Sequence, residues 1–270
     1  MAFIEDIKQR AKKNIKTIVL PEAEDIRILE ATEEVLKEEY ANIVLVGKKE
    51  KIEQKAEENH IDIQGANIIE PELSEKYDQY VNWLYELRKH KGMTIEQAKE
   101  LVKDPVYYGM LMVKDEEVEA DGLVSGAAHS TSDTLRPALQ ILRTAPNTKL
   151  VSAFFVMVVP NCEYGEKGTF IFGDSGLNAN PNPEELEEIA ISSSKSFRQL
   201  VGKEPKVAML SYSTYGSAKS ELTNKVIEAT KILKEKEPNL IADGELQLDA
   251  AIIPEVAEFK APRKSTKRRG

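Results

Sequence analysis

The sequence contains a single cysteine, Cys162, and no long hydrophobic run. One cysteine excludes a disulfide within the chain and any cysteine-based metal site. The longest apolar run, Leu150–Val159, falls well short of the roughly 18 residues of a membrane span and fits a fully buried strand. The N-terminal stretch lacks the apolar core of a signal peptide, and the spacing of Phe3, Ile4 and Ile7 predicts a short helix. These absences predict a cytoplasmic protein.

Several common motifs of nucleotide-binding and hydrolytic enzymes are also absent. There is no G-x-G-x-x-G, no Walker loop and no G-x-S-x-G elbow. The three histidines, His60, His90 and His129, show no ligand spacing, so we infer no metal site. A formal net charge of -9 argues against a general nucleic-acid binder. With 41% hydrophobic and 31% charged residues, the composition is that of a soluble globular protein.

Apolar, β-branched runs alternate with helical patterns along the 270 residues. Strands are expected at Thr17–Leu20, Asn42–Gly47, Asn67–Glu70, Asp121–Gly126, Leu150–Val159, Thr169–Gly173, Lys206–Ser213 and Leu246–Ile253. Helices are expected at 24–39, 72–90, 94–103, 132–143, 183–201 and 217–235. Such alternation predicts an α/β fold with a largely parallel sheet.

Turn-forming residues separate two structured runs near Thr144–Lys149. We therefore predict two α/β domains, 1–145 and 146–262, with a cleft of the kind that often binds ligands. The last residues, 263–270, form a basic tail. The helix after Asn182 has clear start signals, because Asn182 can cap it, Pro183 suits its first turn and Glu185 can complete a capping box.

The stretch "SGAAHSTSD" (Ser125–Asp133) joins an apolar strand to a helical pattern. Unsatisfied amides at a helix start, together with the helix dipole, favour an anion. Hydroxyls follow at 130–132, and Gly126 lets a ligand approach the backbone closely. Arg136 adds donors suited to a phosphate or carboxylate. The alternative interpretation is an ordinary capped helix with a surface arginine.

Three other segments carry polar groups near the ends of predicted elements. Arg88 belongs to a basic cluster at a helix end, which by itself is most often a complement to the helix dipole. Asp174 lies in a Gly- and Asn-rich loop after a strand, where it either lines a ligand site or makes a turn. Ser213 and Thr214 repeat the order of strand, hydroxyls and helix. Binding sites of α/β proteins gather at such strand ends.

Together these segments resemble the phosphate acetyl/butyryl transferase family, which includes the phosphate acetyltransferases. The resemblance extends in family order over nearly all of residues 1–262 and rests on the motifs "LPEAEDIR", "IVLVG", "YELRKHKGMT", "DGLVSGAAHSTSDTLRPALQI", "FIFGDSGLNANPNPEELEEIA", "AMLSYSTYGSAKS" and "DGELQLDAAIIPEVA". It implies a two-domain, three-layer α/β fold similar to isocitrate and isopropylmalate dehydrogenases, with the active site in the interdomain cleft.

The resemblance also implies the reaction acetyl-CoA + phosphate ⇌ CoA + acetyl phosphate, a cytoplasmic homodimer, CoA as substrate and no covalently bound cofactor. Two arginines that handle substrate in the family fall by motif on Arg88 and Arg136. We expect Arg136, with the adjacent Ser130 and Thr131, to be catalytic. Further substrate contacts are expected from Ser125, Gly126, Ser132, Asp174, Ser213 and Thr214. The partners expected are small molecules and a second copy of the chain, without nucleic acid or membrane.

Two features depart from the family pattern. Tyr215 stands where many relatives have lysine, and the end reads "RKSTKRRG" where the family continues with a segment of active-site serine, arginine and aspartate. We interpret the tail 263–270 as a non-native or disordered scar of truncation or frameshift, and alternatively as an electrostatic arm. The truncation interpretation predicts an incomplete first domain, exposed apolar surface and strongly reduced activity, since loss of a general base alone costs about 10²–10⁴ in rate.

Two alternative functions remain. A non-catalytic module that binds acetyl-CoA or acetyl phosphate would use the same residues without turnover. A metal-dependent decarboxylating dehydrogenase of the same fold is disfavoured, because the sequence has no clustered aspartates suited to a divalent metal and a hydroxy acid.

Overall fold

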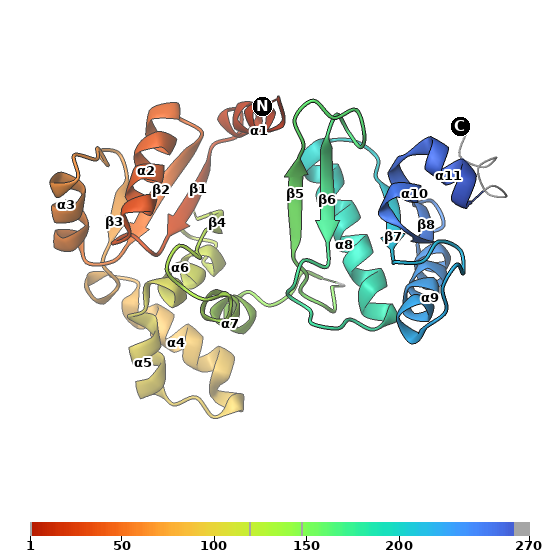
Figure 1. Cartoon of the computed structure of the whole chain (residues 1–270). Helices are drawn as coiled ribbons and strands as arrows, with labels where there is room; N and C mark the ends of the chain where they lie inside the picture. The colour runs from red at the N-terminus through yellow and green to blue at the C-terminus, as the bar shows by residue number, and fades with distance from the viewer. Residues whose placement is uncertain (1, 119, 147, 262–270) are drawn as a thin grey trace. The chain divides into compact units, whose positions relative to one another are not determined.

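The structure is a computed structural model that describes residues 2–118, 120–146 and 148–261 (Figure 1). The described residues divide into two compact units, with most of the chain up to Arg143 in the first and the described residues from Thr144 to Ala261 in the second. The basic tail at 263–270 lies outside the described residues. No helix in the described part of the chain is long and apolar enough to cross a membrane.

The first unit is built on a four-stranded parallel sheet in the order β3-β2-β1-β4. Its strands are β1 (Lys16–Leu20), β2 (Ala41–Val46), β3 (Asn67–Ile69) and β4 (Gly122–Leu123). Its helices are α1 (Ala2–Lys12), α2 (Ile26–Glu38), α3 (Lys49–Glu58), α4 (Tyr77–Arg88), α5 (Ile95–Val102), α6 (Pro105–Lys114) and α7 (Thr131–Ile141), with short 3-10 turns at Pro71–Leu73 and Lys89–Lys91. The sequence predicted these parallel strands, but α3 and α6 were not predicted.

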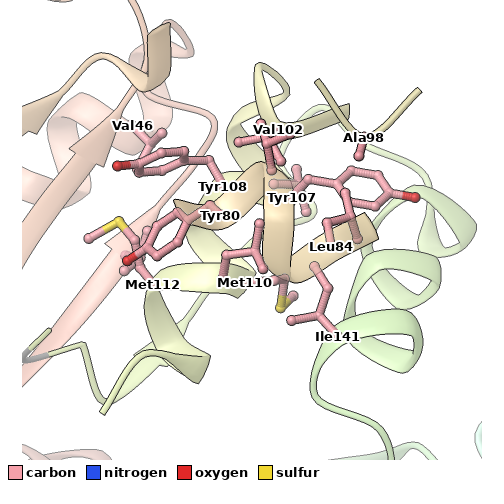
Figure 2. Close-up of a cluster of buried hydrophobic side chains, with 14 of the residues drawn as sticks. Val46, Tyr80, Leu84, Ala98, Val102, Tyr107, Tyr108, Met110, Met112 and Ile141 are labelled. Atoms are coloured by element: carbon pink, nitrogen blue, oxygen red, sulfur yellow. The ribbon is translucent and has the colours of Figure 1, made fainter. Parts of the chain in front are cut away.

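Helix α6 is the centre of the main core of the first unit (Figure 2). All seven of its residues from Val106 to Met112 are buried, so it has no polar face whose periodicity could predict it. Tyr80 of α4 packs against Tyr108 of α6 with ring centroids 5.1 Å apart. Gly109 lets α6 approach the sheet, since a Cβ there would lie 2.6 Å from the Leu123 side chain.

The second unit contains two separate two-stranded ladders. Strands β5 (Phe154–Val158) and β6 (Thr169–Gly173) are antiparallel, whereas β7 (Lys206–Leu210) and β8 (Ile241–Leu246) are parallel. The helices are α8 (Pro183–Val201), α9 (Glu221–Lys236), α10 (Leu248–Ile252) and α11 (Pro254–Lys260). The predicted start of α8 is confirmed, because Asn182 caps it and Glu185 completes the capping box.

Two strand predictions were wrong in the second unit. The run Leu150–Val159 is not a fully buried strand: β5 is shorter, and its residues alternate in exposure. Helix α8 packs against the ladder at Gly173 of β6, the partner of Phe154. The segment Leu246–Ile253 is not a strand either. It begins where β8 ends and continues as α10, since a short apolar run does not distinguish a strand from a buried helix.

Apolar side chains are exposed on both units. On the first, Leu73 is 79% and Val124 is 57% exposed. On the second, Phe155 is 60% and Phe172 is 42% exposed. These two phenylalanines pair across β5 and β6, so they share the face of the ladder opposite to that of Phe154 and its partner Gly173.

Candidate functional site

The loop that follows β4 is folded around the carboxylate of Glu22. Gly126 and Ala127 donate their backbone N–H groups to Glu22 Oε2, at 2.8 and 2.9 Å. Ala128 and His129 donate theirs to Oε1, each at 2.7 Å. The Glu22 side chain is only 2% exposed. The four amides of residues 126–129, here called the amide cradle, are therefore already bonded to an internal carboxylate. At Gly126, where we expected a ligand close to the backbone, the structure has the side chain of Glu22.

The same carboxylate orients the ring of His129. Its Nδ1 lies 2.8 Å from Glu22 Oε1. Burial raises the pKa of Glu22, but the hydrogen bonds from the amide cradle and from His129 outweigh it and lower that pKa to about 2. An ionised carboxylate can only accept hydrogen bonds, so Nδ1 of His129 carries a proton.

Arg27 holds the opposite side of the loop. Its Nη2 donates to the carbonyl oxygen of Ala127 and, at 2.6 Å, to Oδ2 of Asp25. Asp25 also caps α2 by accepting from the backbone N–H of Arg27. The sequence analysis predicted only a helix at 24–39 for this segment and did not single out Glu22. The available signal was an acidic residue placed two positions after the buried end of β1.

Helix α7 begins at the end of this loop with the predicted hydroxyl residues. Ser130 is its N-cap, accepting from the Asp133 backbone N–H, and its own hydroxyl donates to Asp133 Oδ2 at 2.6 Å. The Ser130 hydroxyl also lies 2.9 Å from that of Ser132. Thr131 and Ser132 are exposed in the first turn. The predicted hydroxyls thus gather at the exposed start of α7.

Ser125 lies beside this first turn. The Thr134 hydroxyl donates to Ser125 Oγ at 3.4 Å. Hydrogen bonds from Ser130 lower the pKa of Asp133, and the charges of Arg136 and His129 lower it further. Arg136 and His129 are therefore both close enough to influence the same carboxylate at the start of α7.

Arg88 and Arg136, on different helices, both exert their charge on one buried phenol. Burial raises the pKa of Tyr107, and the positive charges of Arg136 on α7 and Arg88 on α4 both act against that rise. Tyr107 itself donates a hydrogen bond to Gln140 at 3.1 Å. Within the described residues, neither guanidinium has a carboxylate within ion-pair distance. The charges of these two sequence-predicted arginines thus act on the same phenol of the first unit, together with the opposite charge of Asp104.

The guanidinium of Arg88 is incompletely bonded. Its Nε is buried and has no hydrogen-bond partner among the described residues. Buried donors without a protein partner are uncommon in folded proteins, and a bound water or ion satisfies many of them. Arg88 also borders a hollow of about 690 Å³ at the end of α4 and the start of α5. Arg136, by contrast, is exposed.

The predicted residues of the second unit differ in their availability. Asp174 follows β6 and is exposed. Ser213 and Thr214 are buried, and their hydroxyls donate to Glu245 Oε1 at 3.0 Å and to Gln247 Oε1 at 3.3 Å. Their side chains shape the loop after β7 and are already bonded within the protein.

Tyr215, at the position where the family resemblance led us to expect lysine, is also engaged. Its hydroxyl donates to Oδ2 of Asp243. Lys234 lies 3.1 Å from the other oxygen of that carboxylate. Tyr215 therefore belongs to a polar network within the second unit, in which Asp243 contacts both the Tyr215 hydroxyl and Lys234.

Comparisons with known proteins agree on one family. The profile of the family "Phosphate acetyl/butaryl transferase" matches residues 2–269. A phosphate acetyltransferase of Acetivibrio thermocellus is 60% identical over 97% of this chain and 77% of its own length. A phosphotransacetylase structure from Streptococcus pyogenes superposes with a TM-score of 0.88 at 35% identity, covering 98% of this chain and 78% of the other. The EutD phosphotransacetylase from Staphylococcus aureus gives a TM-score of 0.84 at 41% identity, with coverage of 97% and 78%.

Proposed function

Because the chain belongs to the phosphate acetyl/butyryl transferase family, we propose that it transfers an acetyl group between acetyl phosphate and CoA. It is an acyltransferase, and CoA is its substrate with no covalently bound cofactor. The observation that supports this activity best is the availability of the two arginines of the family pattern: Arg88 Nε is buried without a hydrogen-bond partner among the described residues, and Arg136 is exposed near the start of α7. An anionic substrate is the partner that such a pair lacks.

The proposed roles follow from the chemistry of an acyl phosphate. Arg136 and Arg88 bind the phosphoryl oxygens, and the exposed hydroxyls of Ser130, Thr131 and Ser132 donate to them. The positive end of α7 adds to the attraction. Deprotonating a free thiol of pKa near 8.5 at pH 7 costs about 2 kcal/mol. Stabilising the negative charge that develops on the carbonyl oxygen and the leaving phosphate is the larger requirement.

The finer arrangement is part of the proposal. We place the site in an interdomain cleft of a two-domain fold similar to isocitrate dehydrogenase, with Asp174 contributing from the second unit. Ser213 and Thr214 act there by shaping the loop after β7, because their hydroxyls are bonded to Glu245 and Gln247. Ser125 supports the start of α7 through its contact with Thr134.

The proposal extends to the setting of the enzyme. It acts in the cytoplasm as a homodimer on acetyl phosphate, phosphate and CoA. The net charge of -9 supports small-molecule substrates over nucleic acid. Nothing in the comparisons supports either the expected loss of activity or the non-catalytic alternative.

One assay tests the function directly. The purified chain is mixed with acetyl phosphate and CoA, and formation of the acetyl-CoA thioester is followed with time. The proposal expects CoA-dependent consumption of acetyl phosphate and the reverse reaction from acetyl-CoA and phosphate. Binding of acetyl-CoA without turnover would favour the non-catalytic module, and reduction of NAD with isocitrate would favour a dehydrogenase.

A further inference from the structure

The carboxylate of Glu22 occupies a position that in other proteins holds a bound anion. The four amides of the amide cradle, at residues 126–129, all point at its two oxygens at 2.7–2.9 Å. Successive backbone N–H groups that converge in this way form an anion-binding concavity. With the ring of His129 added, Glu22 Oε1 accepts three hydrogen bonds and Oε2 accepts two. The concavity is therefore filled from within the chain.

We propose that Glu22 is a positioning residue of the phosphate site: its carboxylate fills the amide cradle, so that substrate phosphate binds to side chains of α4 and α7 and not to those amides. This inference rests on the function proposed above and deepens it. On this proposal the amide cradle binds the carboxylate of Glu22, and the side chains of α4 and α7 bind the substrate. Glu22 itself makes no contact with substrate.

Because Glu22 is buried, replacing its carboxylate in the amide cradle by phosphate is unfavourable. Substrate phosphate could enter the amide cradle only by displacing a side chain that is 2% exposed and gives up five hydrogen bonds. At the two arginines, phosphate would not have to displace a side chain in this way, since Arg88 Nε has no partner among the described residues and Arg136 is exposed. Phosphate is therefore expected beside the cradle.

The loop is fixed on both of its edges. Glu22 holds its N–H groups, and Arg27 holds the carbonyl oxygen of Ala127. The last residue of the cradle, His129, directly precedes Ser130, the N-cap of α7. The carboxylate of Glu22 therefore fixes where α7 begins and, through the helix, where Arg136 lies. A small displacement of such a positioned group can cost up to about 10²-fold in catalysis.

The first test uses the unmodified chain. Backbone and arginine side-chain N–H signals are followed by nuclear magnetic resonance while inorganic phosphate is added. We expect the N–H signals of Arg88 and Arg136 to shift, while the amides of the cradle stay protected from hydrogen exchange and His129 keeps its Nδ1 proton. Loss of protection at residues 126–129 on adding phosphate would show that phosphate displaces Glu22, and would overturn the inference.

The second test changes the carboxylate. Glu22→Gln keeps the shape of the side chain but points an amide N–H donor at the backbone N–H donors of the cradle. The loop and the start of α7 should therefore shift, and the dissociation constant for phosphate should rise about tenfold. Glu22→Ala empties the cradle, which should then bind one formate per chain, and formate should restore part of the phosphate affinity. The matched control is Asp115→Asn, another buried carboxylate of the first unit that accepts from Tyr80 and Lys76. It should lower stability without changing phosphate affinity.

The two hypotheses fail in different ways. If the unmodified chain neither binds phosphate nor transfers acetyl groups to CoA, the proposed function fails. If it binds phosphate and Glu22→Gln binds phosphate equally well, Glu22 is merely structural and the present inference fails. If Glu22→Ala does not fold, Glu22→Gln and the exchange measurement on the unmodified chain still decide the question.

Discussion

The hydroxyl of Ser213 donates a hydrogen bond to Glu245 Oε1 at 3.0 Å, and both side chains are buried in the second unit. The backbone N–H of Gly216 donates to the same oxygen at 2.6 Å. A carboxylate on β8 thus holds the loop after β7, much as Glu22 after β1 holds the loop after β4 in the first unit. The two units use the same kind of contact to shape a loop next to a parallel strand.

Replacing Glu245 with alanine should destabilise the second unit. The change leaves the Gly216 N–H and the Ser213 hydroxyl without their buried acceptor, and removing one partner from such a group costs about 3 kcal/mol. Urea denaturation should show this loss in the free energy of unfolding. The control is Glu235→Ala, an exposed side chain on α9, expected to change that free energy by less than about 0.5 kcal/mol. Equal effects of the two substitutions would contradict the structural role of Glu245.

Replacing Arg136 should reduce catalysis more than binding of CoA. We expect Arg136→Ala to lower kcat/KM for acetyl phosphate by about 10²–10³-fold, because a charged donor to the developing phosphate is lost. Arg136→Lys should recover only part of the activity, since lysine keeps the charge but not the planar fork of donors. Arg198→Ala on α8, whose guanidinium pairs with exposed Glu204, is the control and should leave the kinetics unchanged. An Arg136→Ala variant with normal kcat/KM would refute the assignment.

Glu22 should contribute to stability in a defined acidic range. Its pKa is lowered from 4.5 to about 2 on folding, so its stabilising effect is complete above pH 4.5 and is lost as pH falls toward 2. A shift of this size corresponds to about 3 kcal/mol. The free energy of unfolding of the unmodified chain should therefore fall more steeply between pH 4.5 and 2 than that of Glu22→Gln. Parallel curves for the two proteins would show that Glu22 does not titrate in this way.

Gly109→Ala should destabilise the first unit although alanine is the better helix former. The new Cβ would lie 2.6 Å from the Leu123 side chain and 2.9 Å from that of Val19. Overpacking of this kind costs about 1–3 kcal/mol, which exceeds the helix-propensity gain of roughly 0.5–1 kcal/mol. Thermal unfolding should show a lower Tm. An unchanged or higher Tm would mean that α6 can move away from the sheet at little cost.

Local signals predicted much of the fold. The start of α8 was readable because Asn182, Pro183 and Glu185 lie within four residues of each other and interact locally. The strands of the parallel sheet in the first unit were readable from β-branched apolar runs. Helix α6 was not readable, because burial of every residue from Val106 to Met112 removes the polar face that would give it a period.

The sequence named candidate residues for the site, which stay predictions, but it did not indicate how their loop is hydrogen-bonded. The family resemblance pointed to Arg88 and Arg136, and the charges of both act on the phenol of Tyr107. Which amides remain free depends on contacts between residues far apart in the sequence, and Glu22 lies 104 to 107 positions from the amides it accepts from. A single sequence does not reveal that a carboxylate from another strand end occupies the amide cradle.

This long separation constrains when the site can form during folding. The loop at residues 126–129 depends on an acidic side chain from a segment about a hundred positions earlier, which reaches it only once β1 and β4 lie side by side. Bringing distant segments together is slow, because the entropy of closing the intervening chain is lost before the contact forms. The phosphate-binding region should therefore mature together with its sheet, and a newly made chain should gain affinity for phosphate only late in folding.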